Sequence, residues 1–207
     1  RRSRIASLAT VLLSLPLSSL PGAVAVDWVS TGALNSGEGA IKTTGSLAYA
    51  YNLGADSTYT VNGVRFNGTA SNGVMDLNGE GNVTFNTVDS GQTINGFSNL
   101  SGDLGSLMGS AQWGSRGNPN TVTLGNLTAG QKYTVQLFSS ETRPGRDNFL
   151  TLDKDTDREF TSASTGSANG GAFVTGTFIA DASGKASFTF VWDSLTGNAN
   201  LNAIQVR

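Results

Sequence analysis

The chain lacks cysteine and histidine altogether, and only 14% of its residues are charged. These absences exclude thiol nucleophiles, imidazole bases and zinc, copper or iron sites built from His or Cys. They also exclude a Ser-His-Asp triad and disulfide bonds. The formal net charge is −2, so no basic surplus is present to neutralise phosphates, and we predict no nucleic-acid partner.

What the chain does contain points to β structure. Of its 207 residues, 38% are hydrophobic, which is enough for the core of one domain. It has 27 Gly and 18 Asn, residues that favour turns over helices. We therefore expect a turn-rich all-β protein rather than a helical one.

The first residues have the pattern of a secretory signal peptide. A cationic start at residues 1–4 precedes an apolar run at 5–20, and a small-residue site ends at Ala25. A membrane anchor or core helix is the alternative, but the run is short and Pro16 would kink it. We predict a signal peptide over 1–25, a single domain over 26–207, and a secreted or cell-surface protein.

Short apolar runs separated by Gly, Asn and Ser follow one another along the rest of the chain. The alternation is clearest at 133–137 and 186–192. The pattern predicts a single antiparallel β-sandwich of the jelly-roll type. Strands are expected at 47–53, 59–66, 83–88, 121–124, 133–137, 149–152, 173–179, 186–192 and 201–206, and a short helix at 103–110.

Three segments carry a resemblance to a known group of domains. The stretch 128–138, with its Gly followed by Tyr-x-Val-x-Leu, resembles malectin-like and galactose-binding-like jelly rolls. The Leu-Asn-Ala ending at 201–206 resembles the last strand of the same domains, and 60–66 is similar to the early part of a group of secreted bacterial β-sandwich proteins. Because these domains are largely carbohydrate-binding modules, the resemblance implies glycan binding.

One loop concentrates charge in a protein that has little. Residues 139–148 join two expected strands and therefore lie at an end of the sandwich, where sites are commonly placed. Arginine forks and carboxylates suit sugar hydroxyls. Pairing among the four charges, which would only stiffen the loop, is the alternative. The predicted ligand-binding residues in this loop are Glu141, Arg143, Arg146 and Asp147.

Trp113 is the fifth predicted ligand-binding residue. It lies in a glycine-rich segment, where an indole ring can stack on the apolar face of a pyranose. The alternative is a tryptophan that covers one end of a sheet. Sequence alone does not tell whether Trp113 and the 139–148 loop share one end of the sandwich.

A second charge cluster offers a candidate metal site. Asp153, Asp155 and Asp157 alternate, as in calcium loops, since Ca²⁺ takes six to eight oxygen ligands. Three aspartates on one face of a strand would repel one another without a cation. The other interpretation is a solvated turn balanced by Lys154 and Arg158. Calcium is the one cofactor that the sequence suggests.

These observations lead to three functional hypotheses. The main one is a secreted, non-catalytic protein, not an enzyme, that binds a glycan or extracellular polysaccharide at the cell surface. The alternative is a self-assembling subunit of an extracellular fibre, sheath or matrix, in which the apolar leader donates a strand. The third is a secreted hydrolase that uses acidic residues, although no spacing among the four glutamates singles out an acid/base pair.

Overall fold

The computed structural model describes residues 24–69, 81–85, 100–114, 119–141, 149–166, 170–192 and 199–207. Of the predicted signal peptide, only Val24 and Ala25 belong to this part, and they form a short strand. Within these ranges no helix is both long and apolar enough to span a bilayer.

Two large sheets contain most of the described strand residues. In the first sheet the strands follow the order β11-β10-β13-β8-β6, and β1 adds to β13 in parallel. Its strands are β1 (Val24–Ala25), β6 (Val83–Phe85), β8 (Asn120–Leu124), β10 (Leu150–Leu152), β11 (Phe160–Thr161) and β13 (Ala186–Trp192).

The second sheet has the order β2-β12-β9-β15-β3-β5-β4. All of its pairs are antiparallel except β3 with β5. Its strands are β2 (Asp27–Ala33), β3 (Tyr49–Asn52), β4 (Tyr59–Val61), β5 (Val64–Gly68), β9 (Lys132–Ser139), β12 (Ala172–Ile179) and β15 (Ala203–Val206).

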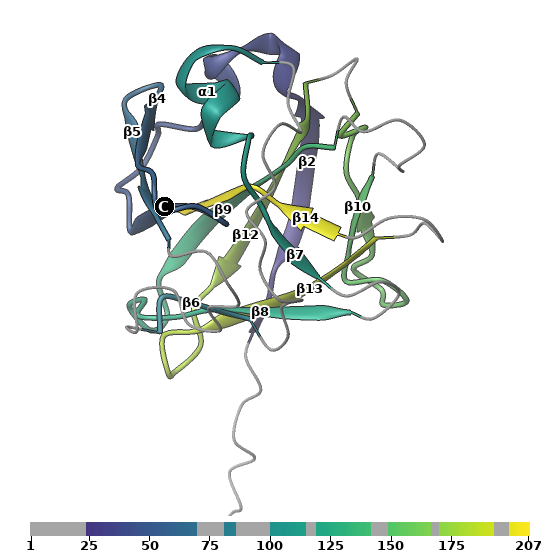
Figure 1. Cartoon of the computed structure of the whole chain (residues 1–207). Helices are drawn as coiled ribbons and strands as arrows, with labels where there is room; N and C mark the ends of the chain where they lie inside the picture. Colours follow the sequence, from purple (N-terminus) through teal and green to yellow (C-terminus); the bar gives the residue numbers. More distant parts are fainter. Residues whose placement is uncertain are drawn as a thin grey trace, which may run out of the picture.

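A few smaller elements complete the described part. They are the two-stranded sheet of β7 (Gln112–Gly114) and β14 (Ala199–Leu201), the 3-10 turns η1 (Leu34–Ser36) and η2 (Glu38–Ala40), and the helix α1 (Gly102–Leu107). Figure 1 shows the two main layers, with β6, β8 and β13 in one and β9 and β12 in the other. The predicted β-sandwich is confirmed.

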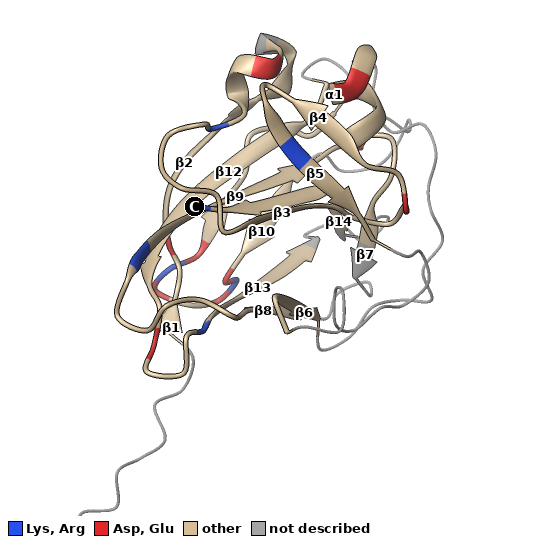
Figure 2. Cartoon of the chain, turned by 90° about the vertical axis from the view of Figure 1, so that its left-hand side faces the viewer, with Lys and Arg blue, Asp and Glu red and all other residues tan. Residues whose placement is uncertain are grey.

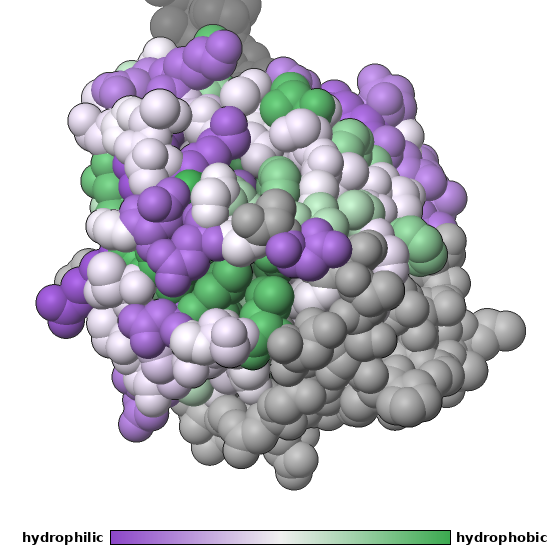
Figure 3. Space-filling view, turned by 90° about the horizontal axis from the view of Figure 1, so that it is seen from above, coloured by the Kyte–Doolittle hydropathy of each residue, from purple (hydrophilic) through white to green (hydrophobic). Residues whose placement is uncertain are grey.

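The hydrophobic residues form two clusters, one on each side of the second sheet. In β9, Val135 and Leu137 point into the cluster between the two sheets. Phe138 points to the opposite side, where it packs edge-on against Phe66 at 5.9 Å and shares a second cluster with Leu107 of α1. The second sheet is therefore covered on both faces, with α1 over its outer face. Figure 3, seen from above, shows a group of hydrophobic residues with hydrophilic residues on several sides of it.

Two connections differ from the simplest expectation. Asn62 and Gly63 fall within the strand expected at 59–66, but their φ angles of 48° and 72° are the two positive values of a type I′ hairpin turn, so this dipeptide interrupts that strand and joins β4 to β5. The 181–185 loop has the length of a hairpin, yet it carries the chain from β12 in the second sheet to β13 in the first. Its conformation is held by Asp181, whose Oδ1 accepts hydrogen bonds from the backbone N–H groups of Ser183 and Lys185.

Asn202, between β14 and β15, joins three parts of the fold through its buried side chain. Its Nδ2 donates to the carbonyls of Met108 and Ser110, each at 2.8 Å, just after α1. Its Oδ1 accepts the backbone N–H of Ser140, just after β9, at 2.7 Å. Asn202 has no exposed surface, so water cannot replace these bonds if they are lost.

We therefore expect Asn202→Ala to lower the free energy of unfolding by about 2–4 kcal/mol, because it leaves buried carbonyl and N–H groups without partners. Urea unfolding followed by circular dichroism measures this change. The matched control is Asn67→Ala at an exposed position of β5, which should stay within about 0.5 kcal/mol of the parent protein. Equal effects of the two substitutions would contradict the role given to Asn202.

Candidate functional site

A segment that we call the strap, residues 40–48, crosses the outer face of the second sheet before β3. It is held there by side chains that rise from β9 and β15. Gln136 donates from Nε2 to the carbonyl of Ala40 at 2.8 Å, and its Oε1 accepts the N–H of Lys42 at 3.0 Å. The strap backbone thus forms with the Gln136 side-chain amide the kind of donor and acceptor bonds that it would form with a neighbouring strand.

A second glutamine extends this support. Gln205 lies opposite Gln136 in the β9–β15 pair and donates from Nε2 to Gln136 Oε1 at 2.6 Å and to the carbonyl of Lys42 at 3.2 Å. Both glutamines are 1% exposed. Buried amides with satisfied hydrogen bonds hold a fixed geometry, so the strap is held rigidly against the sheet.

Arg207 fixes the next part of the strap. Its Nη1 donates to the carbonyls of Thr43 and Gly45, at 3.1 and 2.7 Å, and its Nε donates to Gln205 Oε1 at 3.1 Å. Partial burial lowers the pKa of Arg207, but arginine still carries its charge at neutral pH. The strap thereby becomes a stable wall.

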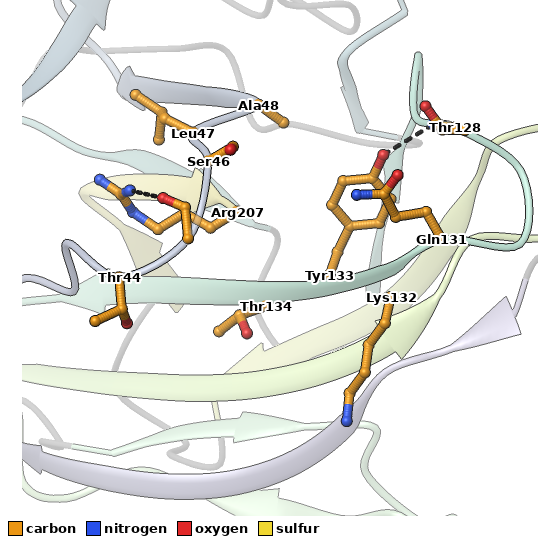
Figure 4. A pocket seen from close by; sticks show the side chains of 11 residues that line it. Thr44, Ser46, Leu47, Ala48, Thr128, Gln131, Lys132, Tyr133, Thr134 and Arg207 are labelled. Carbon is orange, nitrogen blue, oxygen red and sulfur yellow. Dashed lines mark hydrogen bonds between the residues drawn. The ribbon is translucent and has the colours of Figure 1, made fainter.

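Between this wall and the start of β9 lies a cavity of about 510 Å³, which we call the strap groove. Its volume is that of small-molecule sites. Figure 4 shows the strap and Arg207 on one side of the view, and Tyr133, Gln131 and Thr128 on the other. The lining residues are Thr44, Gly45, Ser46, Leu47, Ala48, Thr128, Gln131, Lys132, Tyr133, Thr134 and Arg207.

Tyr133 fixes the opposite wall. Its hydroxyl accepts the N–H of Thr128 at 2.9 Å, and its ring stacks on Phe178 with centroids 5.7 Å apart. Leu47, by contrast, is 40% exposed and supplies an apolar surface to the groove. Sequence reasoning missed this groove because its residues are ordinary Thr, Ser and Gln side chains from three distant segments.

The structure places two of the predicted ligand-binding residues near each other. Trp113 in β7 pairs with Asn200 in β14, and Asn200 donates from Nδ2 to Glu141 Oε2 at 3.3 Å. Glu141 also donates its backbone N–H to the carbonyl of Thr165. The Trp113 backbone and the Glu141 carboxylate therefore belong to the same end of the sandwich. Arg143, Arg146 and Asp147 lie outside the described residues.

Two residues that bond to Glu141 each have a buried side-chain atom with no hydrogen-bond partner among the described residues. They are Oδ1 of Asn200 and Oγ1 of Thr165. We call Glu141, Thr165 and Asn200 the end cluster. Unpaired buried polar atoms are costly, and here they comprise an amide oxygen that accepts and a hydroxyl that can also donate. A hydroxyl group or water can satisfy both kinds, whereas a metal ion cannot satisfy a donor.

The predicted calcium loop has a different structure from the one expected. Asp153 is buried, and its two carboxylate oxygens accept hydrogen bonds from Trp28 Nε1 and the backbone N–H of Thr189, each at 2.8 Å. Asp155 and Asp157 are exposed in turns rather than aligned on a strand.

Within the described ranges, no group of three or more acidic side chains is placed to hold a metal ion. Asp157 pairs with Arg158 at 3.7 Å on the surface, where such pairs contribute little. Figure 2 shows the few charged segments of the described chain scattered over the surface. Calcium binding at Asp153, Asp155 and Asp157 stays a prediction.

Comparison with known proteins gives distant similarities of fold. No family model and no curated protein matches the chain. One similar solved structure is a calcium-binding mutant of Bacteroides uniformis β-glucuronidase 2, with a TM-score of 0.47 and 12% identity, over 77% of this chain and 18% of that one. Another is the exo-β-1,3-galactanase of Phanerochaete chrysosporium with galactose, with a TM-score of 0.37 and 17% identity, over 82% of this chain and 31% of that one.

These names bear on the main functional hypothesis. The structures found are named as glycoside hydrolases, which runs against the prediction of a non-catalytic protein that is not an enzyme, and that prediction is withdrawn. With identities of 12 to 18% and TM-scores of 0.47 or less, the activities in these names remain those of the hydrolases themselves. The jelly-roll-like sandwich agrees with the structures found, whereas no family model supports the malectin-like assignment. None of the names concerns a self-assembling fibre. The chain spans less than a third of the length of the hydrolases it resembles.

Tyr49 follows the strap directly and provides a test of the buried structure at that point. It begins β3 and is 8% exposed, and its ring stacks on Tyr51 with centroids 5.6 Å apart. Burial raises the pKa of the Tyr49 hydroxyl far above that of a free tyrosine, and the neighbouring Tyr51 adds to the effect. The folded state therefore keeps Tyr49 neutral at pH values where the unfolded chain ionises it.

Because the folded-state pKa is the higher one, the stability from neutral Tyr49 is complete below about pH 10 and declines as the pH rises further. We expect Tyr49→Phe to flatten the alkaline decline in unfolding free energy by up to about 1.4 kcal/mol per pH unit. Urea unfolding at pH 9 to 11.5 measures this, with Tyr59→Phe as the control that should keep the parent's decline. The same decline in both variants would contradict the burial of a neutral Tyr49.

Proposed function

We propose that the protein acts on carbohydrate as a glycoside-hydrolysing protein, and that the strap groove is where it holds a saccharide. The groove itself is the observation that carries the second part of the proposal, the holding of a saccharide. One wall is fixed by Gln136, Gln205 and Arg207, and the other by the Tyr133 hydroxyl. A site whose walls are already ordered pays little entropy when a ligand binds.

The chemistry of the lining fits a sugar. Sugar hydroxyls donate and accept hydrogen bonds, and the hydroxyls and amide of Ser46, Thr128 and Gln131 can do both. These three residues are exposed, so they can reach a ligand. The apolar C–H face of a pyranose requires a non-polar surface as well, and the exposed Leu47 side chain supplies one.

The groove by itself cannot cleave a glycosidic bond. Glycoside hydrolysis ordinarily needs two carboxyl groups on either side of the bond, and the part of the groove lining that the structure describes holds no Asp or Glu. We therefore assign cleavage to another part of the protein, and to the groove the role of holding a polymeric substrate.

This division of roles makes a testable prediction. Ser46→Trp places an indole in the groove and blocks it. The number of saccharide molecules bound per protein molecule, measured by isothermal titration calorimetry, should therefore fall by one. The probes are a β-1,3-galacto-oligosaccharide and a glucuronate-terminated oligosaccharide. Hydrolysis of the polymer that the protein cleaves should fall about tenfold, while hydrolysis of a small aryl glycoside should be unchanged.

The matched control is Thr60→Trp, which adds the same side chain at an exposed position of β4. It should bind and cleave like the parent. A parent protein that binds no saccharide overturns the groove assignment, and one that cleaves no glycoside overturns the assignment to hydrolysis.

The end cluster is a second place where we propose contact with sugar, because its unpaired donor and acceptors match the two roles of a hydroxyl. In the Ser46→Trp background, Trp113→Ala should weaken the remaining saccharide binding by about tenfold, the effect of losing a stacking surface. Trp28→Phe, a tryptophan bonded to Asp153, serves as the control. If Ser46→Trp alone abolishes all saccharide binding, the end cluster is not a sugar site.

A further inference from the structure

The strap groove is lined by positively charged residues, although the chain as a whole carries a net negative charge. Acidic residues outnumber basic ones in the sequence, 15 to 13. Among the described residues that line the groove, however, two are basic, Lys132 and Arg207, and none is acidic. A cavity with a single sign of charge attracts ligands of the opposite sign.

Arg207 has hydrogen-bond donors that no described residue uses. Its Nε and Nη1 atoms donate to Gln205, Thr43 and Gly45, whereas Nη2 makes no hydrogen bond within the described residues. All three of these acceptors are neutral oxygens, and no Asp or Glu side chain of the described residues pairs with the guanidinium group. The guanidinium group is therefore held in place with two N–H donors unused.

From this geometry we propose that the strap groove selects a saccharide that bears a carboxylate, that is, a uronic acid residue, and that Arg207 is the residue that recognises it. The inference rests on the proposed function, since it names the class of sugar that the groove holds. A planar carboxylate can accept hydrogen bonds from the Nη2 donors, and such charge-assisted bonds are stronger than bonds between neutral groups.

Lys132 supports this preference in a different way. Figure 4 shows its side chain directed away from Gln131 and Arg207. An ammonium group in that position attracts anions through its field, and it does not fix their orientation. Orientation therefore depends on Arg207, which the strap and Gln205 hold rigidly.

The first experiment needs only the unmodified protein. Isothermal titration calorimetry compares two oligosaccharides of equal length, one ending in glucuronate and one in galactose, at 20 mM and 300 mM NaCl. We expect the glucuronate probe to bind about tenfold more tightly at low salt, and most of this advantage to vanish at high salt, because salt screens an exposed ion pair. The affinity for the galactose probe should not depend on salt.

The second experiment separates charge recognition from neutral hydrogen bonding in the groove. Arg207→Gln should abolish the preference for glucuronate. Gln131→Ala removes a neutral lining side chain and leaves Arg207 and its supports in place, so it should weaken both probes equally and preserve their ratio. Thermal melting of each variant identifies those that remain folded under the assay conditions.

Each outcome has a definite meaning. Equal binding of the two probes, or tighter binding of galactose, overturns the carboxylate preference and leaves the saccharide groove intact. Binding of a sulfated probe in preference to glucuronate also overturns it. A protein that binds neither probe nor any other saccharide overturns the proposed function itself.

Discussion

The buried side chain of Asn202 is the constraint on which the candidate site depends. Its three hydrogen bonds tie the start of β15 to the segment after α1 and to the end of β9. With this end fixed, the register of β15 against β9 places Gln205 opposite Gln136. These two glutamines bond to the strap, and the strap forms one wall of the groove.

A second buried amide continues the same network. Asn52, at the end of β3, accepts a hydrogen bond from the Ser110 hydroxyl at its Oδ1, and its carbonyl accepts one from the Thr69 hydroxyl. Buried polar groups stabilise a fold only when all of them are paired, and they then favour one arrangement strongly over others. The layer that contains α1 is thus fastened to the second sheet by amides as well as by apolar contacts.

The strand β9 separates the two candidate regions. The strap groove lies at its start and the end cluster just beyond its end, about 26 Å apart for eight residues of extended chain. The few charges of the chain leave both regions lined mainly by neutral polar groups. Arg207 and Lys132 are the basic residues of the strap groove, and Glu141 is the carboxylate of the end cluster.

Strands with regular alternation were predictable because one face of each is buried by the sandwich. Val122 and Leu124 in β8 alternate with half-exposed threonines, as period-two burial requires. The edge strand β2 was missed because its residues are mostly exposed, so no apolar period marks it. The crossing of the 181–185 loop between sheets was not predictable either, since a hairpin and a crossing of that length have the same turn residues.

The sequence by itself determined the absence of thiol and imidazole chemistry and the β-sandwich, because these follow from residue types and local periodicity. Only the tertiary structure decided how polar residues are used. It buried Asp153 as a partner of Trp28 and Thr189, where the alternating aspartates had suggested a metal loop. It also assembled the groove from the strap, the start of β9 and Arg207, which lie up to 163 positions apart in the chain. Such a site depends on long-range register and on buried amide pairs, neither of which leaves a local pattern in the sequence.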